Sequence, residues 1–356
     1  MKALIAMSGG VDSSIAAYLM KKAGWDCIGA TMKLFSNEEA GLAEGHVCCS
    51  LSDVFDARSV ANRLQIPYFV FNFQDDFRRC VIDEFVRSYL NGLTPNPCIE
   101  CNRRLKFGRL LRRAEELGCD CVATGHYARI EKSCGRHLLK KGLDESKDQS
   151  YVLCTLTQKQ LAMLNFPLGA MKKSEVRAMA AQLGFVNAKK HDSQDICFAP
   201  DGDYAKTIER IRGCVLPRGK FTDADGCELG KHRGLARYTI GQRKGLGLSF
   251  GEPRYVVALH PEENTVVLGA EKELWSRTLL AANFNWIAGQ APAERLRLKV
   301  KIRYRQPEQW AEVEPLGTDK VRLVFDEPQR AAAPGQYAVL YDGDCVAGGG
   351  VICRQI

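Results

Sequence analysis

The residues with the clearest chemical potential are Ser8-Gly9-Gly10-Val11-Asp12-Ser13-Ser14, which stand between two predicted elements. The apolar run 2–7 predicts a buried strand and residues 15–22 predict a helix. Glycines allow a tight backbone turn, and a helix N-terminus offers unpaired N–H groups with a partial positive charge. The stretch therefore predicts a phosphate-binding loop, in preference to an ordinary capped turn. It lacks the lysine of a Walker A loop, so serine hydroxyls are the expected donors, and Asp12 would serve a metal ion or orient the loop.

A second candidate site contains two cysteines, Cys98 and Cys101, in a proline-containing stretch that we expect to be a loop. Arg103, Arg104 and Lys106 follow, where a helix is predicted to begin. Cations and a helix N-terminus both lower the pKa of a thiol and make it nucleophilic. Two cysteines at this spacing can also bind a metal or form a redox disulfide. A zinc site needs four ligands, and no second pair at zinc-finger spacing is present.

Cys197 is the third thiol of interest, because the polar run 191–195 before it favours a loop over a core strand. Cys48 and Cys49 are adjacent, a spacing that rarely suits one tetrahedral ion, so a structural role is favoured for them. The chain has 15 cysteines in 356 residues. Without a secretory signal, most are expected to be reduced thiols.

The composition is that of a globular protein with two or three domains, since 46% of residues are hydrophobic and 26% are charged. The apolar runs are too short to span a membrane, and the chain starts with a strand pattern instead of a signal peptide. We therefore expect a cytoplasmic protein with no membrane partner.

Three regions differ in pattern. Residues 1–203 alternate apolar runs with helical patterns, which predicts an α/β domain with a mostly parallel sheet and a ligand site at the carboxyl ends of its strands. Residues 204–275 are glycine-rich and basic and predict a small central domain. Residues 276–356 show only strand patterns, spaced as in a small barrel or sandwich.

The most basic of these strand patterns is 295–305, where cations alternate with apolar residues. The alternation predicts a strand with six cations on one face and an apolar face in the core. Like charges at this density repel, which favours a polyanionic partner over a solvated surface. The glycine-rich loop 241–247 is also basic. Together the two segments favour a nucleic acid as partner.

The motifs as a set resemble a known family. Residues 8–13 resemble the PP-loop of the N-type ATP pyrophosphatases, and the later motifs, in the same order, are similar to bacterial tRNA-specific 2-thiouridylases, the MnmA family. Those motifs are Cys48-Cys49-Ser50, Asp56-Ala57-Arg58, Asn96-Pro97 with Cys101-Asn102, Thr124-Gly125-His126-Tyr127, Lys147-Asp148-Gln149-Ser150-Tyr151, Ser193-Gln194-Asp195-Ile196-Cys197-Phe198, Gly241-Gln242-Arg243-Lys244-Gly245 and Arg303-Tyr304-Arg305-Gln306. The PP-loop alone would indicate only the superfamily.

The resemblance implies an N-terminal adenine-nucleotide α-hydrolase-like (PP-loop) domain, a small central domain and a C-terminal all-β barrel. It implies a tRNA-uridine 2-sulfurtransferase that uses ATP, with Mg²⁺, to adenylate C2 of the wobble uridine in tRNAs for Lys, Glu and Gln. A cysteine desulfurase or a sulfur relay protein would deliver persulfide sulfur. Cys101 would be the nucleophile, and Cys197 would carry sulfur as a persulfide before a disulfide forms between them.

The remaining implied roles are binding roles. ATP would be bound by Ala6, Met7, Ser8, Gly9, Gly10, Val11, Asp12, Ser13, Met32 and Gly125. Transfer RNA would be bound by Asn96, Pro97, Cys98, His126, Lys147, Asp148, Gln149, Arg303, Tyr304, Arg305, Gln306 and Gln336, with residues 96–98 near the target base.

One position departs from the family pattern: some members have Asp where this chain has Cys98. Glu100 or a water would then replace that carboxylate as general acid or base. Cys98, Cys101 and Cys197 also resemble the three-cysteine [4Fe–4S] sites of related tRNA thiolases, so a cluster is an alternative to the persulfide. Two further alternatives are a PP-loop ligase that adenylates a small molecule, which would need neither the thiols nor the basic barrel, and a non-catalytic RNA-binding protein.

Overall fold

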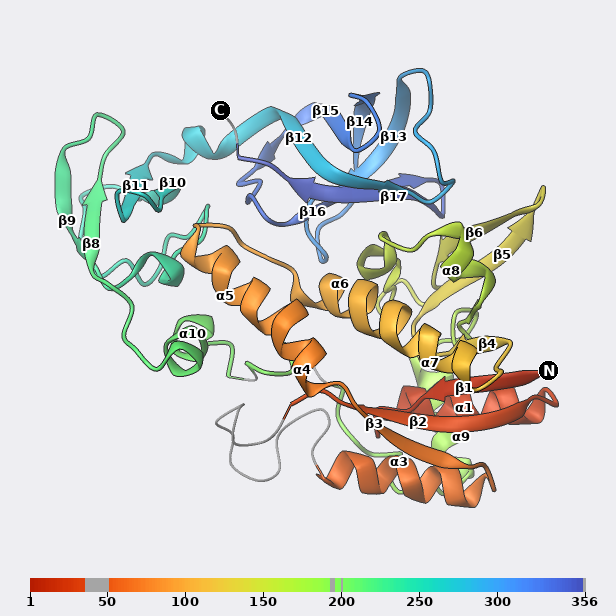
Figure 1. Ribbon diagram of the computed structural model, residues 1–356. Helices are drawn as coiled ribbons and strands as arrows, with labels where there is room; N and C mark the ends of the chain where they lie inside the picture. Colours follow the sequence, from red (N-terminus) through yellow and green to blue (C-terminus); the bar gives the residue numbers. More distant parts are fainter. Residues whose placement is uncertain (36–50, 193–195, 200, 355–356) are drawn as a thin grey trace.

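The computed structural model describes all residues except 36–50, 193–195, 200 and 355–356. The predicted Cys48-Cys49-Ser50 motif and the Ser193-Gln194-Asp195 part of the motif that contains Cys197 therefore lie outside the described residues. Three bodies follow one another along the chain: a parallel sheet with helices on both faces, a small four-stranded sheet and an antiparallel barrel (Figure 1). The predicted fold class is confirmed. None of the helices in the described part of the chain is long and apolar enough to cross a membrane.

The N-terminal sheet has the strand order β3-β2-β1-β4-β7, and all its pairings are parallel. Its strands are β1 (Lys2–Ala6), β2 (Asp26–Lys33), β3 (Tyr68–Asn72), β4 (Cys121–Ala123) and β7 (Leu164–Asn165). The strand order reverses between β1 and β4. In open parallel sheets such a switch point opens a crevice at the carboxyl ends of the strands, so the predicted phosphate loop, which follows β1, lies at its edge.

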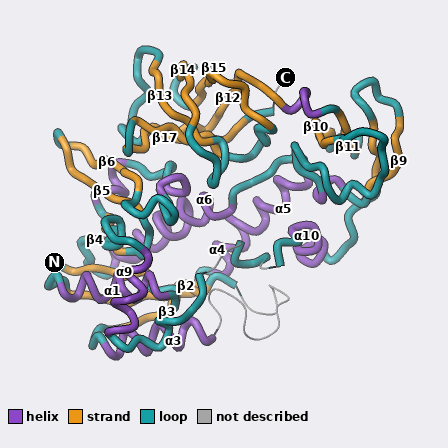
Figure 2. Tube along the Cα trace, turned by 180° about the vertical axis from the view of Figure 1, so that it is seen from behind, coloured by secondary structure: helices purple, strands orange, loops and turns teal. Residues whose placement is uncertain are grey.

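Helices cover both faces of this sheet, as Figure 2 also shows from behind. One face packs against α1 (Val11–Lys22), α3 (Leu51–Arg63) and α9 (Lys173–Gln182). The larger core cluster lies on the other face, with α4 (Gln74–Phe77), a π-helical segment Arg78–Ile82, α5 (Asp83–Leu90), α6 (Pro97–Cys101), a second π-helical segment Asn102–Arg109, α7 (Leu110–Glu116) and α8 (Gln158–Ala162).

The helix that carries the paired cysteines begins earlier than the sequence predicts. It runs without a break through α6, the second π-helical segment and α7. Its N-cap is Asn96, whose Oδ1 accepts a hydrogen bond from the Ile99 amide at 3.3 Å, and Pro97 occupies the first turn. Both residues favour a helix start. Cys98 and Cys101 therefore lie within the helix, and the loop expected for them is wrong.

The central body follows α10 (Tyr204–Arg212) and has the strand order β10-β11-β8-β9. Its strands are β8 (Gly219–Thr222), β9 (Glu228–His232), β10 (Tyr255–His260) and β11 (Thr265–Gly269). Two 3-10 turns also belong to this region, Leu235–Arg237 and Glu271–Leu274, and a third, Ser150–Leu153, lies in the N-terminal region. This body has its own hydrophobic core, with Phe221, Val256 and Val266 fully buried.

The C-terminal strands form a barrel that is closed by the pairing of β12 with β17. They are β12 (Trp275–Trp286), β13 (Leu296–Lys301), β14 (Gln309–Pro315), β15 (Lys320–Arg330), β16 (Tyr337–Asp342) and β17 (Cys345–Ile352). A hairpin of the N-terminal region, β5 (Ala128–Ser133) and β6 (Arg136–Lys141), extends the barrel sheet where Lys140 pairs with Cys345. The domain boundaries predicted from composition stay predictions. The hairpin belongs to the predicted domain 1–203 but pairs with a strand of the predicted domain 276–356.

The basic strand is shorter than predicted, because β13 ends at Lys301 and residues 302–305 form a turn. Its N-terminal cations are also neutralised by the neighbouring strands. Arg295 pairs with Glu312 at 2.7 Å and Glu314 at 2.9 Å, and Arg297 pairs with Asp326 at 2.6 Å. The expected repulsion within the strand is therefore wrong for this half, since alternating charges are supplied from β14 and β15.

Candidate active site

The loop after β1 has the tight geometry that its glycines predict. Gly9 has φ +78°, and a Cβ there would lie 2.4 Å from the Asp53 carbonyl oxygen, so no larger residue fits. The Ser8 amide donates to Ser13 Oγ at 3.1 Å, and the Ser13 and Ser14 hydroxyls each donate to the Gly10 carbonyl at 3.0 Å. The hydroxyls thus hold the loop in shape.

The other residues predicted to bind ATP lie close to this loop. A Cβ on Gly125, just after β4, would be 2.8 Å from the Asp12 carbonyl carbon, so the backbone after β4 touches the start of α1. Met7 is anchored to β2, because its carbonyl accepts from the Thr31 hydroxyl at 2.6 Å, next to Met32. The fold brings these segments together at the switch point. Their role in binding ATP stays a prediction.

Asp12 is the centre of a charge network that the sequence did not indicate. Its carboxylate accepts from Lys173 Nζ at 2.7 Å on both oxygens and from the Tyr127 hydroxyl at 2.8 Å. Lys173 Nζ also lies 2.8 Å from Asp192. A lysine at the start of a helix gives no signal of this kind in a single sequence.

Asp192 links this network to one of the predicted tRNA-binding residues. It receives Lys147 at 2.8 Å and Arg177 at 2.7 Å in addition to Lys173. Partial burial raises the pKa of the Asp192 carboxyl, but the hydrogen bonds from Lys147 and Lys173 have a larger, opposite effect. Together they lower the pKa to about 2. Asp192 is therefore charged throughout the physiological range, and the Lys147 side chain is directed to it.

Two more residues from the same part of the chain hold the other side of the loop. Lys190 Nζ lies 2.5 Å from Asp53, 2.7 Å from Asp56 and 3.5 Å from the Gly9 carbonyl oxygen. The buried Asn187 donates from Nδ2 to the Gly9 carbonyl and to Ser14 Oγ, both at 2.9 Å. The segment after α9 thus surrounds the loop.

The paired thiols differ in environment. Cys98 is exposed, whereas Cys101 is half-buried and packs against the large N-terminal core cluster. Burial raises the pKa of the Cys101 thiol to about 11, and Lys106 offsets this only in part. The lowered pKa expected from the neighbouring cations is therefore wrong for Cys101 in this structure.

Glu100, between the two cysteines, explains why the arginines do not activate the thiol. Its carboxylate pairs with Arg104 at 2.9 Å and Arg103 at 3.5 Å, and it accepts a hydrogen bond from the Tyr337 hydroxyl at 2.9 Å. It thus neutralises both cations and ties the helix to β16. With these three partners, Glu100 is committed to the structure and is poorly suited to replace the missing Asp as general acid or base.

Cys197 lies in a turn and packs, like Cys101, against the large core cluster. Its neighbour Phe198 is buried and contacts Phe85 edge-on, with 5.1 Å between ring centroids. None of the three candidate thiols is in a disulfide. Among the residues that the structure describes, no three His, Cys, Asp or Glu side chains are grouped so as to hold a metal ion. The thiols as arranged do not fit an iron–sulfur cluster, which needs them around one centre.

The residues predicted to bind tRNA form two groups. Near the cysteines, Gln336 donates from Nε2 to the Thr94 carbonyl at 2.9 Å, and Tyr304 donates to the Asp148 carbonyl at 3.0 Å. Asp148 and Gln149 are engaged internally: Asp148 accepts from the Ser150 hydroxyl at 2.8 Å and Gln149 accepts from the Tyr127 amide at 3.0 Å. Gln336 therefore adjoins Thr94, and segment 147–149 adjoins segment 303–306. The contact of these two groups with tRNA stays a prediction.

His126 and the 303–306 turn show how differently these candidates are exposed. His126 is buried between Phe107 and Phe166, with 5.7 Å between ring centroids in each case, and burial lowers its pKa well below the usual value. Its packing does not favour direct contact with RNA. Arg303 donates to the Ala331 carbonyl and Gln306 to Gln329, whereas Arg305 is exposed.

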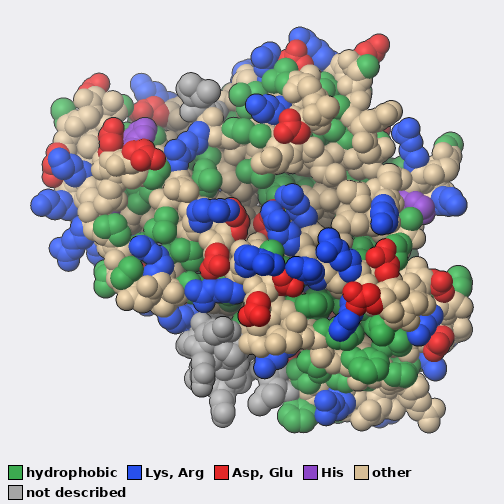
Figure 3. Space-filling model, viewed as in Figure 1, with side chains coloured by type: hydrophobic (Ala, Val, Ile, Leu, Met, Phe, Trp, Pro, Cys, Tyr) green, Lys and Arg blue, Asp and Glu red, His purple; other side chains and the backbone are tan. Residues whose placement is uncertain are grey.

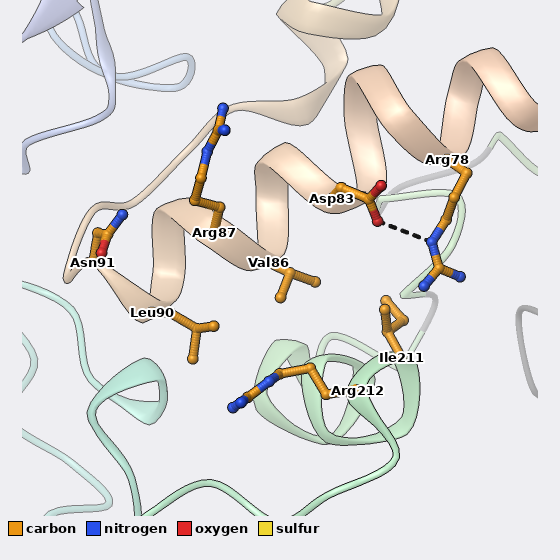
Figure 4. Close-up of a pocket in the computed structure, with 8 residues that line it drawn as sticks. All are labelled: Arg78, Asp83, Val86, Arg87, Leu90, Asn91, Ile211 and Arg212. Carbon is orange, nitrogen blue, oxygen red and sulfur yellow. Dashed lines mark hydrogen bonds and ion pairs between the residues drawn. The ribbon is translucent and has the colours of Figure 1, made fainter.

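Two basic grooves, which the sequence did not indicate, lie on the face that carries α5 and α6. Figure 3 shows Lys and Arg side chains gathered across its middle. One groove, of about 430 Å³, is lined by Arg103, Arg104, Arg109 and Arg112 with Cys80. The other, of about 330 Å³, lies between α5 and α10 and has Val86, Leu90 and Ile211 in its lining. In Figure 4, Arg212 extends toward Leu90, Arg78 pairs with Asp83, and Arg87 points away from Ile211.

Comparison with known proteins gives consistent matches along the chain. Family models described as the tRNA methyl transferase HUP domain, the tRNA methyl transferase PRC-barrel domain and the aminomethyltransferase beta-barrel domain match residues 1–201, 207–270 and 276–352. The chain is 53% identical to the tRNA-specific 2-thiouridylase MnmA of Moorella thermoacetica, covering 98% of each chain. It is 51% identical to that of Acetivibrio thermocellus, with 99% of each covered, and 49% identical to that of Clostridioides difficile, with 100% of this chain and 99% of the relative covered.

Proposed function

The chain belongs to the family of tRNA-specific 2-thiouridylases, MnmA, and we propose that it converts the wobble uridine of tRNAs for Lys, Glu and Gln to 2-thiouridine. The single observation that carries the proposal is full-length similarity at about half identity, together with the loop, both candidate thiols and the barrel in one fold. We place the reaction in the cytoplasm, where tRNA and reduced cysteines occur together.

The first step is activation of the uridine by ATP. The C2 oxygen attacks the α-phosphate, the bond to the β-phosphate breaks, and pyrophosphate leaves. The loop N–H groups and the N-terminus of α1 face the crevice and suit an anion there. Mg²⁺ fits the site, because this ion binds through one or two carboxylates with phosphate oxygens and water, and Asp12 is the carboxylate of the loop. Bound there, it would supply charge neutralisation to the phosphates.

Sulfur transfer then uses the two thiols. A protein persulfide donor, a cysteine desulfurase or a relay protein, passes its outer sulfur to Cys197 and keeps its own thiol. The outer sulfur of the Cys197 persulfide attacks C2 and AMP leaves with the former C2 oxygen. The Cys101 thiolate attacks the inner sulfur, so the S–S bond breaks, a Cys101–Cys197 disulfide forms and the sulfur stays on C2. A cellular thiol reductant restores the two thiols.

Transfer RNA binding would rest on cations far from the loop. Arg305, the basic loop 241–247 and one arginine in each groove, Arg112 and Arg212, offer phosphate contacts without base readout. The other groove arginines already face carboxylates. Segments 94–98, 147–149 and 303–306 adjoin the cysteine helix and would receive the extruded uridine. The alternative of a small-molecule ligase leaves these surfaces without a use.

The decisive experiment measures wobble nucleosides by mass spectrometry in a deletion strain, with and without this gene. Restored 2-thiouridine is expected. With purified protein, pyrophosphate release should require uridine-containing tRNA, and thiolation should also require a persulfide donor. Release that depends on an amine and proceeds without tRNA would instead indicate a small-molecule ligase, and the absence of any release would indicate an RNA-binding protein.

A further inference from the structure

The phosphate loop has no cation of its own, although its proposed leaving group is strongly anionic. Residues 8–14 contain no Lys or Arg, whereas a Walker A loop carries a lysine for the phosphates. Backbone N–H groups and a helix N-terminus together amount to about half a positive charge. A site that releases pyrophosphate therefore needs cations from elsewhere in the fold.

The segment from α9 onward places two lysines beside the loop. Lys173 Nζ lies 2.7 Å from both oxygens of Asp12, and only 8% of Lys173 is exposed. Lys190 Nζ lies on the Gly9 side, 3.5 Å from that carbonyl oxygen. The two ammonium groups thus flank the loop from opposite ends.

Among the described residues, the ion pairs around the loop balance in charge. Four carboxylates, Asp12, Asp53, Asp56 and Asp192, face four cations, Lys147, Lys173, Arg177 and Lys190. Each of the two lysines is shared between two carboxylates. Lys173 can turn to a phosphate oxygen because its two carboxylates have other partners: Asp12 keeps Tyr127, and Asp192 keeps Lys147 and Arg177.

An independent observation also indicates a ligand at this place. Asn187 is 3% exposed and donates from Nδ2 to the Gly9 carbonyl and to Ser14 Oγ, both at 2.9 Å. Its own oxygen, Oδ1, is buried with no hydrogen-bond partner in the described structure. A buried acceptor left unsatisfied is costly. The water molecules on a magnesium pyrophosphate are donors of the kind it lacks.

We propose that Lys173 and Lys190 are the cationic ligands of the leaving pyrophosphate, supplied from outside the loop and held ready by the acidic residues around it. The inference rests on the proposed function, since it assigns part of the ATP site. It predicts that these lysines act on the β- and γ-phosphates and leave the binding of AMP unchanged.

The test is direct binding of magnesium pyrophosphate and of AMP to the full chain by calorimetry. Lys173→Met and Lys190→Met should each weaken pyrophosphate binding about 10- to 100-fold, as expected for loss of one charge-assisted contact, with AMP affinity unchanged. The matched controls are Lys172→Met and Lys189→Met, at exposed neighbouring positions, which should bind both ligands like the unaltered protein.

A variant with the opposite charge change separates a ligand site from a structural ion network. Asp192→Asn removes a carboxylate from Lys173 and should leave pyrophosphate binding equal or tighter. A merely structural network would make Asp192→Asn as harmful as Lys173→Met, which would overturn the proposal. Unaltered pyrophosphate binding in folded Lys173→Met and Lys190→Met would also overturn it. If the unaltered protein binds neither pyrophosphate nor ATP, the proposed function itself fails.

Discussion

The hydroxyl of Tyr337, in the barrel, donates a hydrogen bond to Glu100, which lies between the two cysteines of the N-terminal helix, at 2.9 Å. Burial and the nearby carboxylate raise the pKa of Tyr337, so this hydroxyl stays a donor. Since Glu100 also holds Arg103 and Arg104, the barrel indirectly takes those charges away from the thiols. Burial raises the pKa of the Cys101 thiol to about 11, so the thiol is uncharged at neutral pH.

The reactivity of Cys101 should therefore rise with pH across the neutral range. Its pKa of about 11 lies above the ordinary value, so the thiolate fraction grows about tenfold for each pH unit from 7 to 9. We expect the rate of alkylation of Cys101, followed by peptide mass spectrometry, to rise with a slope near one on a logarithmic scale. A plateau below pH 8 would contradict the raised pKa. Bound tRNA should accelerate the alkylation of Cys101 if it supplies the missing activation.

The loop variants Asp12→Ala and Ser13→Ala should abolish ATP-dependent activation and leave tRNA binding largely intact. Asp12 holds Lys173 and Tyr127, and Ser13 closes the loop on Gly10, so both losses act on the pyrophosphate end of the site. Pyrophosphate release and filter binding of tRNA measure the two properties separately. Asp225→Ala, an exposed position in the central body, is the matched control. Retained adenylation in Asp12→Ala would remove the loop from the mechanism.

Cys101→Ser and Cys197→Ser should each eliminate 2-thiouridine formation, because a hydroxyl is a far weaker nucleophile than a thiolate and cannot hold persulfide sulfur. Nucleoside mass spectrometry after a single turnover is the readout. Cys119→Ser and Cys121→Ser are controls: these buried thiols should lose stability but keep activity. Cys48→Ser is expected to be tolerated too, at a position outside the described residues. Near-native thiolation by Cys197→Ser would show that sulfur takes another route.

The turn after β13 should contribute to tRNA affinity. Removing Arg303 and Arg305 together should weaken tRNA binding without changing ATP affinity, and should reduce the log–log salt slope by about 0.7 to 0.9 for each lost phosphate contact. The control is a variant that lacks Arg295 and Arg297, which already face carboxylates on β14 and β15. Its salt slope should change less. An unchanged slope in the 303/305 variant would mean that these cations face water.

Ile302, in the same turn, tests the barrel core. Its side chain is 1% exposed within the barrel cluster. Ile302→Ala should lower the free energy of unfolding by about 2 to 5 kcal/mol, measured by urea denaturation. Val324→Ala, at a 39% exposed position on β15, should change it by only about 0.5 kcal/mol. Equal effects of the two substitutions would contradict the burial of Ile302.

The local features were predictable because they depend on neighbouring residues. Periodicity and turn chemistry predict the strand, glycine loop and helix of residues 2–22. They also predict the alternating strands and helices of the parallel sheet and the closely spaced strands of the barrel. The resemblance added the roles of the thiols and the binding segments. One local signal was overlooked: Asn96 and Pro97 are ordinary helix-start residues, yet the helix was expected to begin later.

The charge around each site depends on contacts between segments far apart in the sequence. Lys173 reaches Asp12 across 161 residues, and Glu100 meets Tyr337 across 237. No pattern in a single sequence reports such pairs, because a lysine or glutamate looks alike whether it meets solvent or a partner. Burial sets the pKa of Cys101. The distance between remote segments decides that carboxylates pair with Arg295 and Arg297 and that Lys173 and Lys190 lie beside the loop. The amino-acid sequence shows which ionisable groups are present, but burial and ion pairing in the fold set which of them carry a charge that a ligand can use.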